Sequence, residues 1–539
     1  MRRACQDRAS SGALLGSPLA HSIIAAPHTG IYMTRTITEL LAQPAAEAPA
    51  LLAPGRPTLS FGGLRSQVES VVEQLNQLGV GRNDSVAIVL PNGPEMASAF
   101  VCIAAGATTA PLNPAYGRDE FEFYLTDLDA QLLVVQAGDA TPARAAANKL
   151  GIEIAELHCS EADPAGVFSL TGQRATAPVA DEQAGFAEAG DVALVLHTSG
   201  TTSRPKIVPL SQENICASAG NIAASLELVP ADCCLNVMPL FHIHGLIAAT
   251  LAALSAGASI VCTPGFNALK FFALLEEYSP SWYTAVPTMH QAILGRAGRN
   301  KDIIAAARLR LIRSSSASLP PQVMSELETT FGVPVIEAYG MTEAAHQMAC
   351  NPLPPRDRKP GTVGVAAGPE IAIMTATGEL LPSGDVGEVV IRGANVTSGY
   401  RNNDSANATA FSHGWFRTGD QGVIDADGYL RLTGRLKEII NRGGEKISPR
   451  EVDEVLLDHP AVAQVVTFAV PHPKLGEDVA AALVLEEGTD VSERDIREFV
   501  AERLVDFKVP RRILFLDEIP KGATGKLQRI GLAEKLGLA

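Results

Sequence analysis

Residues 197–206 read His197-Thr198-Ser199-Gly200-Thr201-Thr202-Ser203-Arg204-Pro205-Lys206, a run of small hydroxyl residues that ends in a lysine. The apolar residues 192–196 directly before it predict a buried strand. Hydroxyl groups and the amides around Gly200 can donate hydrogen bonds to phosphate oxygens, and Lys206 adds a mobile positive charge. The stretch therefore predicts a loop that binds nucleotide phosphates, although a solvated Ser/Thr-rich connector has a similar composition.

This loop differs from the Walker P-loop, in which Gly-x-x-x-x-Gly-Lys-Ser/Thr opens a helix. The stretch contains one glycine, and Lys206 is followed by Ile207 instead of a hydroxyl residue. A nucleotide would therefore be bound here in another way. Motifs further along the chain must decide between a nucleotide loop and a plain connector.

The size and charge of the chain narrow the class of protein. A chain of 539 residues is too long for one compact core and predicts at least two domains. Apolar residues make up 46% of the chain and charged residues 19%, which excludes a mostly disordered protein. The net charge of −16 argues against nucleic acid as a partner, because phosphate backbones are bound by clustered Lys and Arg.

The cysteine pattern and the hydropathy indicate the cellular setting. The eight cysteines are scattered and form no C-x-x-C pair of the kind that binds zinc, which is typical of a reducing compartment. No apolar stretch is long enough to span a bilayer. We therefore predict a large cytoplasmic enzyme without a membrane span.

Short apolar runs alternate with helical patterns through the first four fifths of the chain. Residues 85–90, 108–112 and 132–136 predict strands, and residues 94–105 predict a helix. This alternation predicts an α/β fold with parallel sheets covered by helices.

The chain is expected to divide near Arg435, after a hairpin-like turn at 425–429. Glycines become frequent after about residue 360 and predict a smaller β-rich subdomain before that boundary. The predicted organisation is an extension at 1–32 without stable structure, a large domain at 33–434 and a small α/β domain at 435–539.

A second nucleotide-type motif is Glu337-Ala338-Tyr339-Gly340-Met341-Thr342-Glu343, which follows the strand-like residues 333–336. Tyr339 could pack on a purine, and Thr342 could bond the α-phosphate. Glu343 could hold Mg²⁺ directly or through water, as carboxylates do in phosphate sites. We expect a helix after this motif, and a purely structural place for Glu343 at its N-terminus is the alternative.

A third motif is Gly414-Trp415-Phe416-Arg417-Thr418-Gly419-Asp420. Asp420 is suited to accept hydrogen bonds from both hydroxyls of a ribose. Taken alone, it would be an ordinary aspartate in a turn.

The three motifs, in this order and at this spacing, resemble those of the adenylate-forming superfamily of acyl-CoA synthetases, adenylation domains and luciferases. The resemblance extends from Ile37 to Ala539 and includes two further signatures of that superfamily: Gly434-Arg435-Leu436-Lys437-Glu438-Ile439-Ile440 and Pro520-Lys521-Gly522-Ala523-Thr524-Gly525-Lys526. One departure is Ile207, where the superfamily usually has glycine, and it affects only the fine geometry of the loop.

The resemblance implies ATP and Mg²⁺ as cofactors and coenzyme A as a co-substrate. Lys526, Thr342 and Glu343 would be catalytic, Glu343 would bind the metal, and Lys437 would be the hinge of a mobile C-terminal lid. The nucleotide-binding residues that it implies are Thr198, Ser199, Gly200, Thr201, Thr202, Ser203, Arg204, Pro205, Lys206, Glu337, Ala338, Tyr339, Gly340, Met341, Thr342, Asp420, Arg435 and Lys526.

The reaction implied by the resemblance has two steps. The acid first joins ATP with release of pyrophosphate, because oxide is a poor leaving group and AMP is a good one; a thiol then attacks the acyl-adenylate. In the first step a carboxylate approaches an anionic α-phosphate, and Mg²⁺ and Lys526 would offset the repulsion. The chain is thus expected to be an AMP-forming acid–thiol ligase.

Three places where the acid substrate should lie are unusually polar: residues 241–245, residues 313–318 and those just after Glu343. A pocket with two histidines and a serine favours a second anion on the substrate, since an unpaired buried carboxylate costs several kcal/mol. The motifs here look most like those of oxalate–CoA ligases, which implies His244, Ser316 and His346 as oxalate contacts. His346 is expected one helical turn beyond Glu343. Structural roles for both histidines are the alternative, and Arg313 is a reserve candidate.

Three other functions remain open on the sequence. A ligase for malonate or another short or medium acid would differ only in its pocket. A free-standing adenylation enzyme would load a carrier protein in trans, because no carrier domain follows Lys526. A nucleotide sensor without turnover is disfavoured by the joint presence of Lys526, Glu343 and Asp420.

Overall fold

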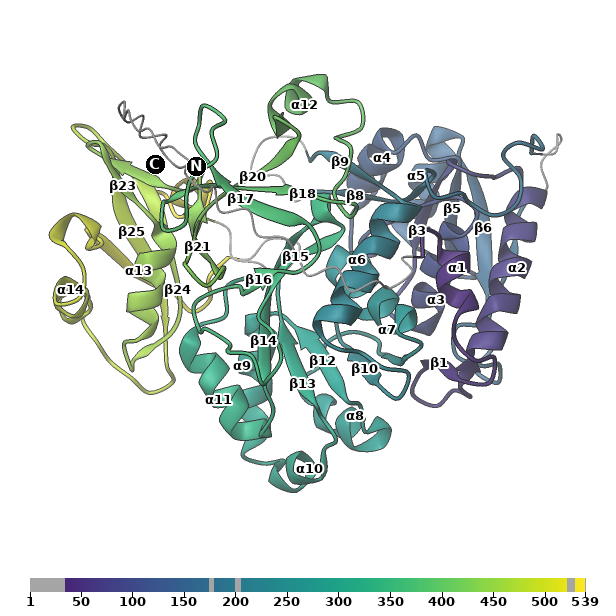
Figure 1. The fold of residues 1–539 in the computed structure, drawn as a ribbon, viewed down its shortest axis with the longest axis horizontal. Coiled ribbons are helices and arrows are strands. Elements are labelled where there is room, and N and C mark those ends of the chain that lie inside the picture. The colour runs from purple at the N-terminus through teal and green to yellow at the C-terminus, as the bar shows by residue number, and fades with distance from the viewer. Residues whose placement is uncertain (1–33, 174–178, 199–204, 521–528, 539) are drawn as a thin grey trace, which may run out of the picture.

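The computed structural model describes residues 34–173, 179–198, 205–520 and 529–538 (Figure 1). The predicted extension at 1–32, the loop residues 199–204 and Lys526 lie outside the described residues.

A mainly parallel sheet of seven strands, called here the N-terminal sheet, has the strand order β7-β6-β5-β3-β4-β8-β9. Its two edge strands, β7 and β9, are antiparallel to their neighbours. All five residues of the central strand β3 are buried, as expected for a strand with both faces covered. The strands are β3 (Ser85–Val89), β4 (Thr108–Pro111), β5 (Leu132–Gln136), β6 (Glu153–His158), β7 (Ser169–Thr171), β8 (Val192–His197) and β9 (Ile207–Ser211).

A second sheet of nine strands, called the central sheet, has the order β16-β15-β14-β13-β12-β10-β11-β1-β2. Its middle strands are parallel, and β2, β15 and β16 pair in the antiparallel sense. The strands are β1 (Pro49–Leu52), β2 (Leu59–Ser60), β10 (Cys233–Asn236), β11 (Ser259–Cys262), β12 (Trp282–Ala285), β13 (Leu311–Ser314), β14 (Val335–Met341), β15 (His346–Cys350) and β16 (Val365–Ala366).

Helices fill the space between these two sheets and form one continuous apolar core with them (Figure 1). Helix α6 packs on β8 and β9 on one side and on β15 on the other, and α3 bridges β4 and β11. The helices of this layer are α1 (Ile37–Ala42), α2 (Phe61–Gln77), α3 (Pro94–Ala104), α6 (Gln212–Ser225), the π-helix η1 (His244–Leu251) and α7 (Ala252–Ser255).

The outer faces of both sheets are covered by other helices, each with its own apolar cluster. On the N-terminal sheet these are α4 (Arg118–Asp127) and α5 (Pro142–Leu150). On the central sheet they are α8 (Phe271–Tyr278), α9 (Pro287–Ala297), α10 (Lys301–Ala306) and α11 (Pro321–Phe331).

An antiparallel sheet follows, as the glycine pattern predicts. Strands β17 (Glu370–Met374), β18 (Gly387–Arg392), β20 (Trp415–Ile424) and β19 (Phe411–Ser412) are neighbours in that order, and β21 (Leu430–Arg435) pairs with β20. Helix α12 (Asp404–Ala410) precedes β19. The β-rich subdomain is therefore confirmed.

The C-terminal part has a sheet of its own, with apolar clusters on both faces. Strand β25 pairs with β24, β22 and β26, and only its pairing with β26 is parallel. The elements are β22 (Ile440–Arg442), β23 (Glu445–Ile447), α13 (Pro449–Leu457), β24 (Val462–His472), β25 (Gly476–Leu485), α14 (Glu493–Ala501), the 3-10 turn η3 (Asp506–Lys508), β26 (Arg512–Phe515) and α15 (Leu532–Lys535). Parallel sheets, a β-rich subdomain and a small α/β unit confirm the predicted fold class, whereas the boundary at 434/435 stays a prediction.

The helix expected after the second motif is wrong. Strand β14 runs through Met341, the short 3-10 turn η2 (Thr342–Ala344) follows, and the chain returns as strand β15. Ala345 and His346 have φ angles of 46° and 99°, which end the turn in the left-handed region. Asn395 fastens it by donating to the carbonyls of Ala344 and Gln347 at 2.8 and 2.9 Å. His346 is therefore not one helical turn beyond Glu343 but the first residue of an antiparallel strand.

Two smaller observations concern membranes and cysteines. Among the described residues, no helix combines the length and the apolar character that a membrane span requires. The seven cysteines in the part of the chain that the structure describes are all free thiols.

We predict that Gly340→Ala disrupts the return from β14 to β15. A Cβ atom on Gly340 would lie 1.8 Å from the carbonyl oxygen of His346, so the strand pair must separate. The expected loss is more than about 2 kcal/mol of folding free energy, measured by thermal unfolding. Gly295→Ala on α9 is the control, because its Cβ would meet no atom within 4 Å. Equal melting temperatures of Gly340→Ala and wild type would contradict this account.

Candidate active site

The carboxyl ends of three neighbouring strands meet at one edge of the central sheet. Thr284 lies near the end of β12, Arg313 near the end of β13, and the second motif continues β14. The strand register places Thr284 opposite Arg313, and Ser314 opposite Glu337. Ligands of α/β sheets bind outside this edge, which makes it the candidate active site.

The second and third motifs contact each other through Asp420. Tyr339 donates its hydroxyl hydrogen to Oδ2 of Asp420 at 2.5 Å, and Nε of Arg435 donates to Oδ1 at 2.8 Å. Burial, together with the charge of Asp420, raises the pKa of Tyr339 well above its ordinary value, so the phenol remains a donor. Each carboxylate oxygen of Asp420 keeps a second lone pair, which leaves room for the ribose hydroxyls predicted from sequence.

Glu343 joins the second motif to the first. It is 7% exposed, and its Oε1 accepts a hydrogen bond from the hydroxyl of Tyr400 at 2.9 Å. Nζ of Lys206 lies 4.2 Å from the centre of the Tyr400 ring. Burial raises the pKa of Glu343 and lowers that of Lys206, while the attraction between their charges opposes both shifts. A cation, a phenol and a carboxylate are thus gathered where the phosphates of ATP are expected.

The first motif lies between β8 and β9, and its described ends are held together. The amide of Thr198 donates to the carbonyl of Lys206 at 2.9 Å, and the amide of Lys206 donates to Oγ1 of Thr198 at 3.2 Å. Pro205 is half-buried beside Lys206. The residues between these ends, Ser199, Gly200, Thr201, Thr202, Ser203 and Arg204, lie outside the described residues.

The structure describes the predicted hinge residue, Lys437, but not the predicted catalytic lysine, Lys526. Lys437 is exposed in the segment between β21 and β22, and its charge helps to lower the pKa of Lys206 after the effect of burial. Its role as a hinge stays a prediction. Lys526 cannot be placed, because it lies outside the described residues.

The three residues predicted to contact the acid lie together. Nδ1 of His244 is 3.0 Å from Oγ of Ser316, and the ring centres of His244 and His346 are 5.1 Å apart. His244 and His346 are both nearly fully buried, at 2% and 1% exposure. The structure therefore places two imidazole rings and a hydroxyl beside the second motif, a few residues from Glu343.

Local backbone geometry explains how His244 reaches this place. It is the first residue of the π-helix η1, and π-helical turns often occur at functional sites. A Cβ atom on Gly245 would lie 2.3 Å from the carbonyl oxygen of Pro239, so only glycine allows this close approach. The helix can therefore start directly beside the strand ends.

Glu337 directs its carboxylate to the loop that carries Ser316, and its predicted contact with the nucleotide stays a prediction. Its Oε1 accepts a hydrogen bond from the amide of Leu319 at 3.0 Å, and Ser315 in the same loop donates to the carbonyl of Ala338 at 2.9 Å. Ser316 has a φ of 72°, a conformation that this loop imposes. Burial raises the pKa of Glu337 to about 7.

The sequence reasoning missed Tyr400, Thr284 and Gln347. Thr284 Oγ1 lies 2.6 Å from Nε2 of His244, and Gln347 accepts a hydrogen bond from Arg313 at 3.2 Å. For Gln347 a signal existed, because it directly follows His346. Tyr400 and Thr284 are uncharged residues outside the three motifs, so nothing in the sequence was a reason to select them.

The residues present fit a magnesium ion bound with ATP. Among the described residues, no group of three His, Cys, Asp or Glu side chains is gathered as a metal site of its own. Mg²⁺ usually binds one or two carboxylates together with substrate phosphates, and the buried Glu343 is such a carboxylate.

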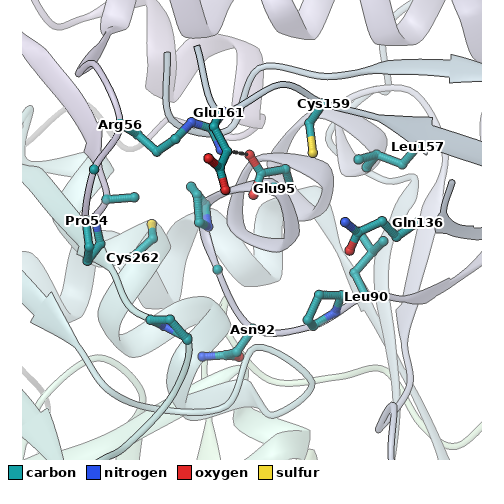
Figure 2. A pocket seen from close by; sticks show the side chains of 16 residues that line it. Pro54, Arg56, Leu90, Asn92, Glu95, Gln136, Leu157, Cys159, Glu161 and Cys262 are labelled. Carbon is teal, nitrogen blue, oxygen red and sulfur yellow. Dashed lines mark hydrogen bonds and ion pairs between the residues drawn. The ribbon is translucent and has the colours of Figure 1, made fainter. Parts of the chain in front are cut away.

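A separate cavity of about 340 Å³ lies between β1, β11 and the ends of β3, β5 and β6 (Figure 2). Arg56, the one cation among the described residues that line it, donates to Glu95 at 2.8 Å and to the carbonyls of Asp163 and Pro164 at 3.0 and 3.2 Å. Because Glu95 neutralises Arg56, this cavity offers no unbalanced positive charge. It lies outside the three motifs.

Comparison with known proteins identifies the fold and its family. Residues 39–401 match the AMP-binding enzyme family, and residues 451–526 match the AMP-binding enzyme C-terminal domain. The chain belongs to the AMP-binding enzyme family. The resemblance inferred from the three motifs is thereby confirmed.

Similar AMP-binding enzymes cover most of this chain. An oxalate–CoA ligase of Arabidopsis thaliana is 46% identical and covers 92% of this chain and 97% of its own length. An oxalate–CoA ligase of Saccharomyces cerevisiae is 43% identical over 84% of this chain and 87% of its own. The crystal structure of ATP-bound MatB from Rhodopseudomonas palustris superimposes with a TM-score of 0.83 at 28% identity, covering 93% and 99% of the two chains.

We predict that Glu337→Gln changes how stability depends on pH. The ordinary pKa of this carboxyl is 4.5 and its pKa in the fold is about 7, so the folded protein binds the proton more tightly. Wild-type stability should therefore fall between pH 4.5 and 7, by at most about 3 kcal/mol, and Gln should remove that fall. The melting temperature of Glu337→Gln minus that of wild type should rise from pH 5 to pH 8.

Glu326→Gln is the matched control, because Glu326 is an exposed carboxyl on α11. The difference in melting temperature between Glu326→Gln and wild type should not change with pH. A pH-independent difference for Glu337→Gln as well would contradict the burial argument.

Proposed function

We propose that this AMP-binding enzyme converts oxalate, ATP and coenzyme A to oxalyl-CoA, AMP and diphosphate. The observation that carries the proposal is the cluster of His244, Ser316 and His346 beside Glu343. The similarity to oxalate–CoA ligases over most of the chain supports it.

In the first step one carboxylate of oxalate attacks the α-phosphorus of ATP, and pyrophosphate leaves. In this proposal Thr342 and Lys206 would hold phosphate oxygens, and Asp420 would orient the ribose. The position of Lys206 beside Tyr400 and the contact of Arg435 with Asp420 support these roles. Mg²⁺ bound at Glu343 would neutralise part of the phosphate charge. Lys526 would supply a further positive charge in this step, as the superfamily resemblance implies.

During this step the second carboxylate of oxalate must be bound by protein groups, because it loses its hydration shell in the buried site. Hydrogen bonds from His244, Ser316 and His346 would replace its hydration shell, with the carboxylate taking the place of Ser316 as the partner of Nδ1 of His244. These bonds are required because an unpaired buried carboxylate costs several kcal/mol. Oxalate is the smallest diacid, so its two carboxylates lie only one bond apart and must occupy adjacent places. The short separation between Glu343 and His346 in the chain suits this requirement.

In the second step the thiolate of coenzyme A attacks the carbonyl carbon of oxalyl-AMP, and AMP leaves. A rotation of the C-terminal domain about Lys437 is part of the proposal. The cytoplasmic location, the domain boundary at 434/435 and the disorder of residues 1–32 are also still predictions.

The reaction is tested by CoA-dependent release of AMP and pyrophosphate from ATP and Mg²⁺ with a panel of acids. Oxalate should exceed malonate, acetate, a medium-chain fatty acid and 4-coumarate in kcat/KM by at least about tenfold, a difference near 1.4 kcal/mol. Preference for another acid would reject the oxalate pocket and keep the ligase. Adenylate formation without CoA-dependent turnover would favour carrier-protein loading.

We predict that His346→Ala weakens use of oxalate far more than use of ATP. Removing one hydrogen-bonding partner of a buried charge should raise the KM for oxalate by roughly tenfold to a hundredfold. The KM for ATP should stay within about twofold, because nothing places His346 at the nucleotide. An equal rise in the KM for oxalate and the KM for ATP would contradict the assignment of His346 to the acid site. His158→Ala on β6, an exposed histidine, is the control.

A further inference from the structure

Arg313 on β13 is a fully buried arginine with neutral partners. Nη1 donates to Oγ1 of Thr284 at 3.4 Å, and Nη2 donates to Oε1 of Gln347 at 3.2 Å and to Nδ1 of His346 at 3.5 Å. Nε has no hydrogen-bond partner, and the side chain is 0% exposed.

No salt bridge to Arg313 is found in the described part of the chain. Even partly exposed arginines are paired, such as Arg310 with Asp232 at 2.9 Å and Arg417 with Glu388 at 2.5 Å. Burial lowers the pKa of Arg313 to about 10, so it stays charged at neutral pH. A buried charge without a partner costs folding free energy, and Arg313 is therefore suited to an anion that is not part of the protein.

Arg313 contacts both histidines that are predicted to bind the acid, His346 directly and His244 through Thr284. Thr284 Oγ1 contacts both Arg313 and Nε2 of His244, whose Nδ1 faces Ser316. A guanidinium can only donate hydrogen bonds, so Nδ1 of His346 accepts. Neutral His346 then carries its hydrogen on Nε2, which makes that nitrogen a donor. The charge of Arg313 thus lies beside the cluster of His244, Ser316 and His346.

We propose that Arg313 is a positioning residue that makes the acid pocket selective for dicarboxylates. Its charge attracts the second carboxylate, and its contacts hold His244, through Thr284, and His346 in the orientations that bind it. The inference rests on the proposed function and deepens it, since it names the residue that sets the substrate class.

Selectivity follows from charge balance. One carboxylate of a dicarboxylate attacks the α-phosphate, and the other lies in the pocket. The negative charge of the second carboxylate balances the positive charge of Arg313. A monocarboxylate leaves Arg313 without a counter-charge and would place a methyl or alkyl group against it. The pocket therefore disfavours monoacids by an unpaired charge as well as by shape.

The test compares Arg313→Met, Arg313→Lys and Arg310→Met in the full-length enzyme. Met keeps an unbranched apolar side chain and removes the charge, and Lys keeps the charge. Arg310 lies three residues earlier in the chain, and its salt bridge to the buried Asp232 makes Arg310→Met a matched control for the loss of an ordinary structural arginine. Each variant is measured for kcat, for KM with oxalate and with ATP, and for melting temperature.

Arg313→Met should raise the KM for oxalate on the order of a hundredfold, with the KM for ATP within about twofold. Its melting temperature should equal or exceed that of wild type, because removing a buried unpaired charge does not destabilise a fold. Arg313→Lys should recover part of the oxalate affinity. Arg310→Met should show the reverse pattern: a lower melting temperature and an unchanged KM for oxalate.

Two results would overturn the proposal. One is an unchanged KM for oxalate in Arg313→Met; the other is a lower melting temperature or failure to fold, which would make Arg313 a structural residue. Wild-type turnover separates this inference from the proposed function. If wild type prefers another dicarboxylate, oxalate is wrong and the variants are measured with that acid; if it uses only monocarboxylates, both proposals fall.

Discussion

The close approach of Gly340 to the carbonyl of His346 is the constraint on which the candidate site depends. Because Gly340 has no side chain, its backbone can approach the carbonyl of His346 closely, and β14 can turn back as β15 over very few residues. That reversal directs Tyr339 toward Asp420, Glu343 toward Tyr400 and His346 toward His244. One tight reversal thus brings the residues predicted to bind the nucleotide and those predicted to bind the acid to the same edge of the central sheet.

The site also shows how an acidic protein can handle anionic substrates. The chain has a net charge of −16, yet Lys206, Arg435 and Arg313 gather where phosphates and carboxylates are expected. Lys206 and Arg435 have carboxylates nearby, whereas Arg313 has none in the described part of the chain. The distribution of charge in space, not its sum, therefore fits the chemistry of the AMP-binding enzymes.

The elements with strong local signals could be predicted from the sequence. Residues 132–136 form β5 as expected, and residues 94–105 differ from α3 by one residue at the C-terminal end, since proline and glycine mark such boundaries. The return of the chain as strand β15 after Glu343, in place of the expected helix, was not predictable in this way, because these residues have adequate helix propensity and tertiary contacts from Asn395 override it. Tyr400 and Thr284 were missed because their partners lie 57 and 40 residues away in the chain.

The sequence by itself determined the family, the order of the motifs and the choice of His244, Ser316 and His346 as candidates for the acid site, because these depend on residue types at fixed spacings. Only the tertiary structure decided that Glu337 holds the loop of Ser316 and that Arg313 is buried among neutral partners. Burial and the absence of a counter-charge depend on everything that surrounds a side chain in space. Those neighbours come from strands far apart in the chain, so no local pattern could reveal them.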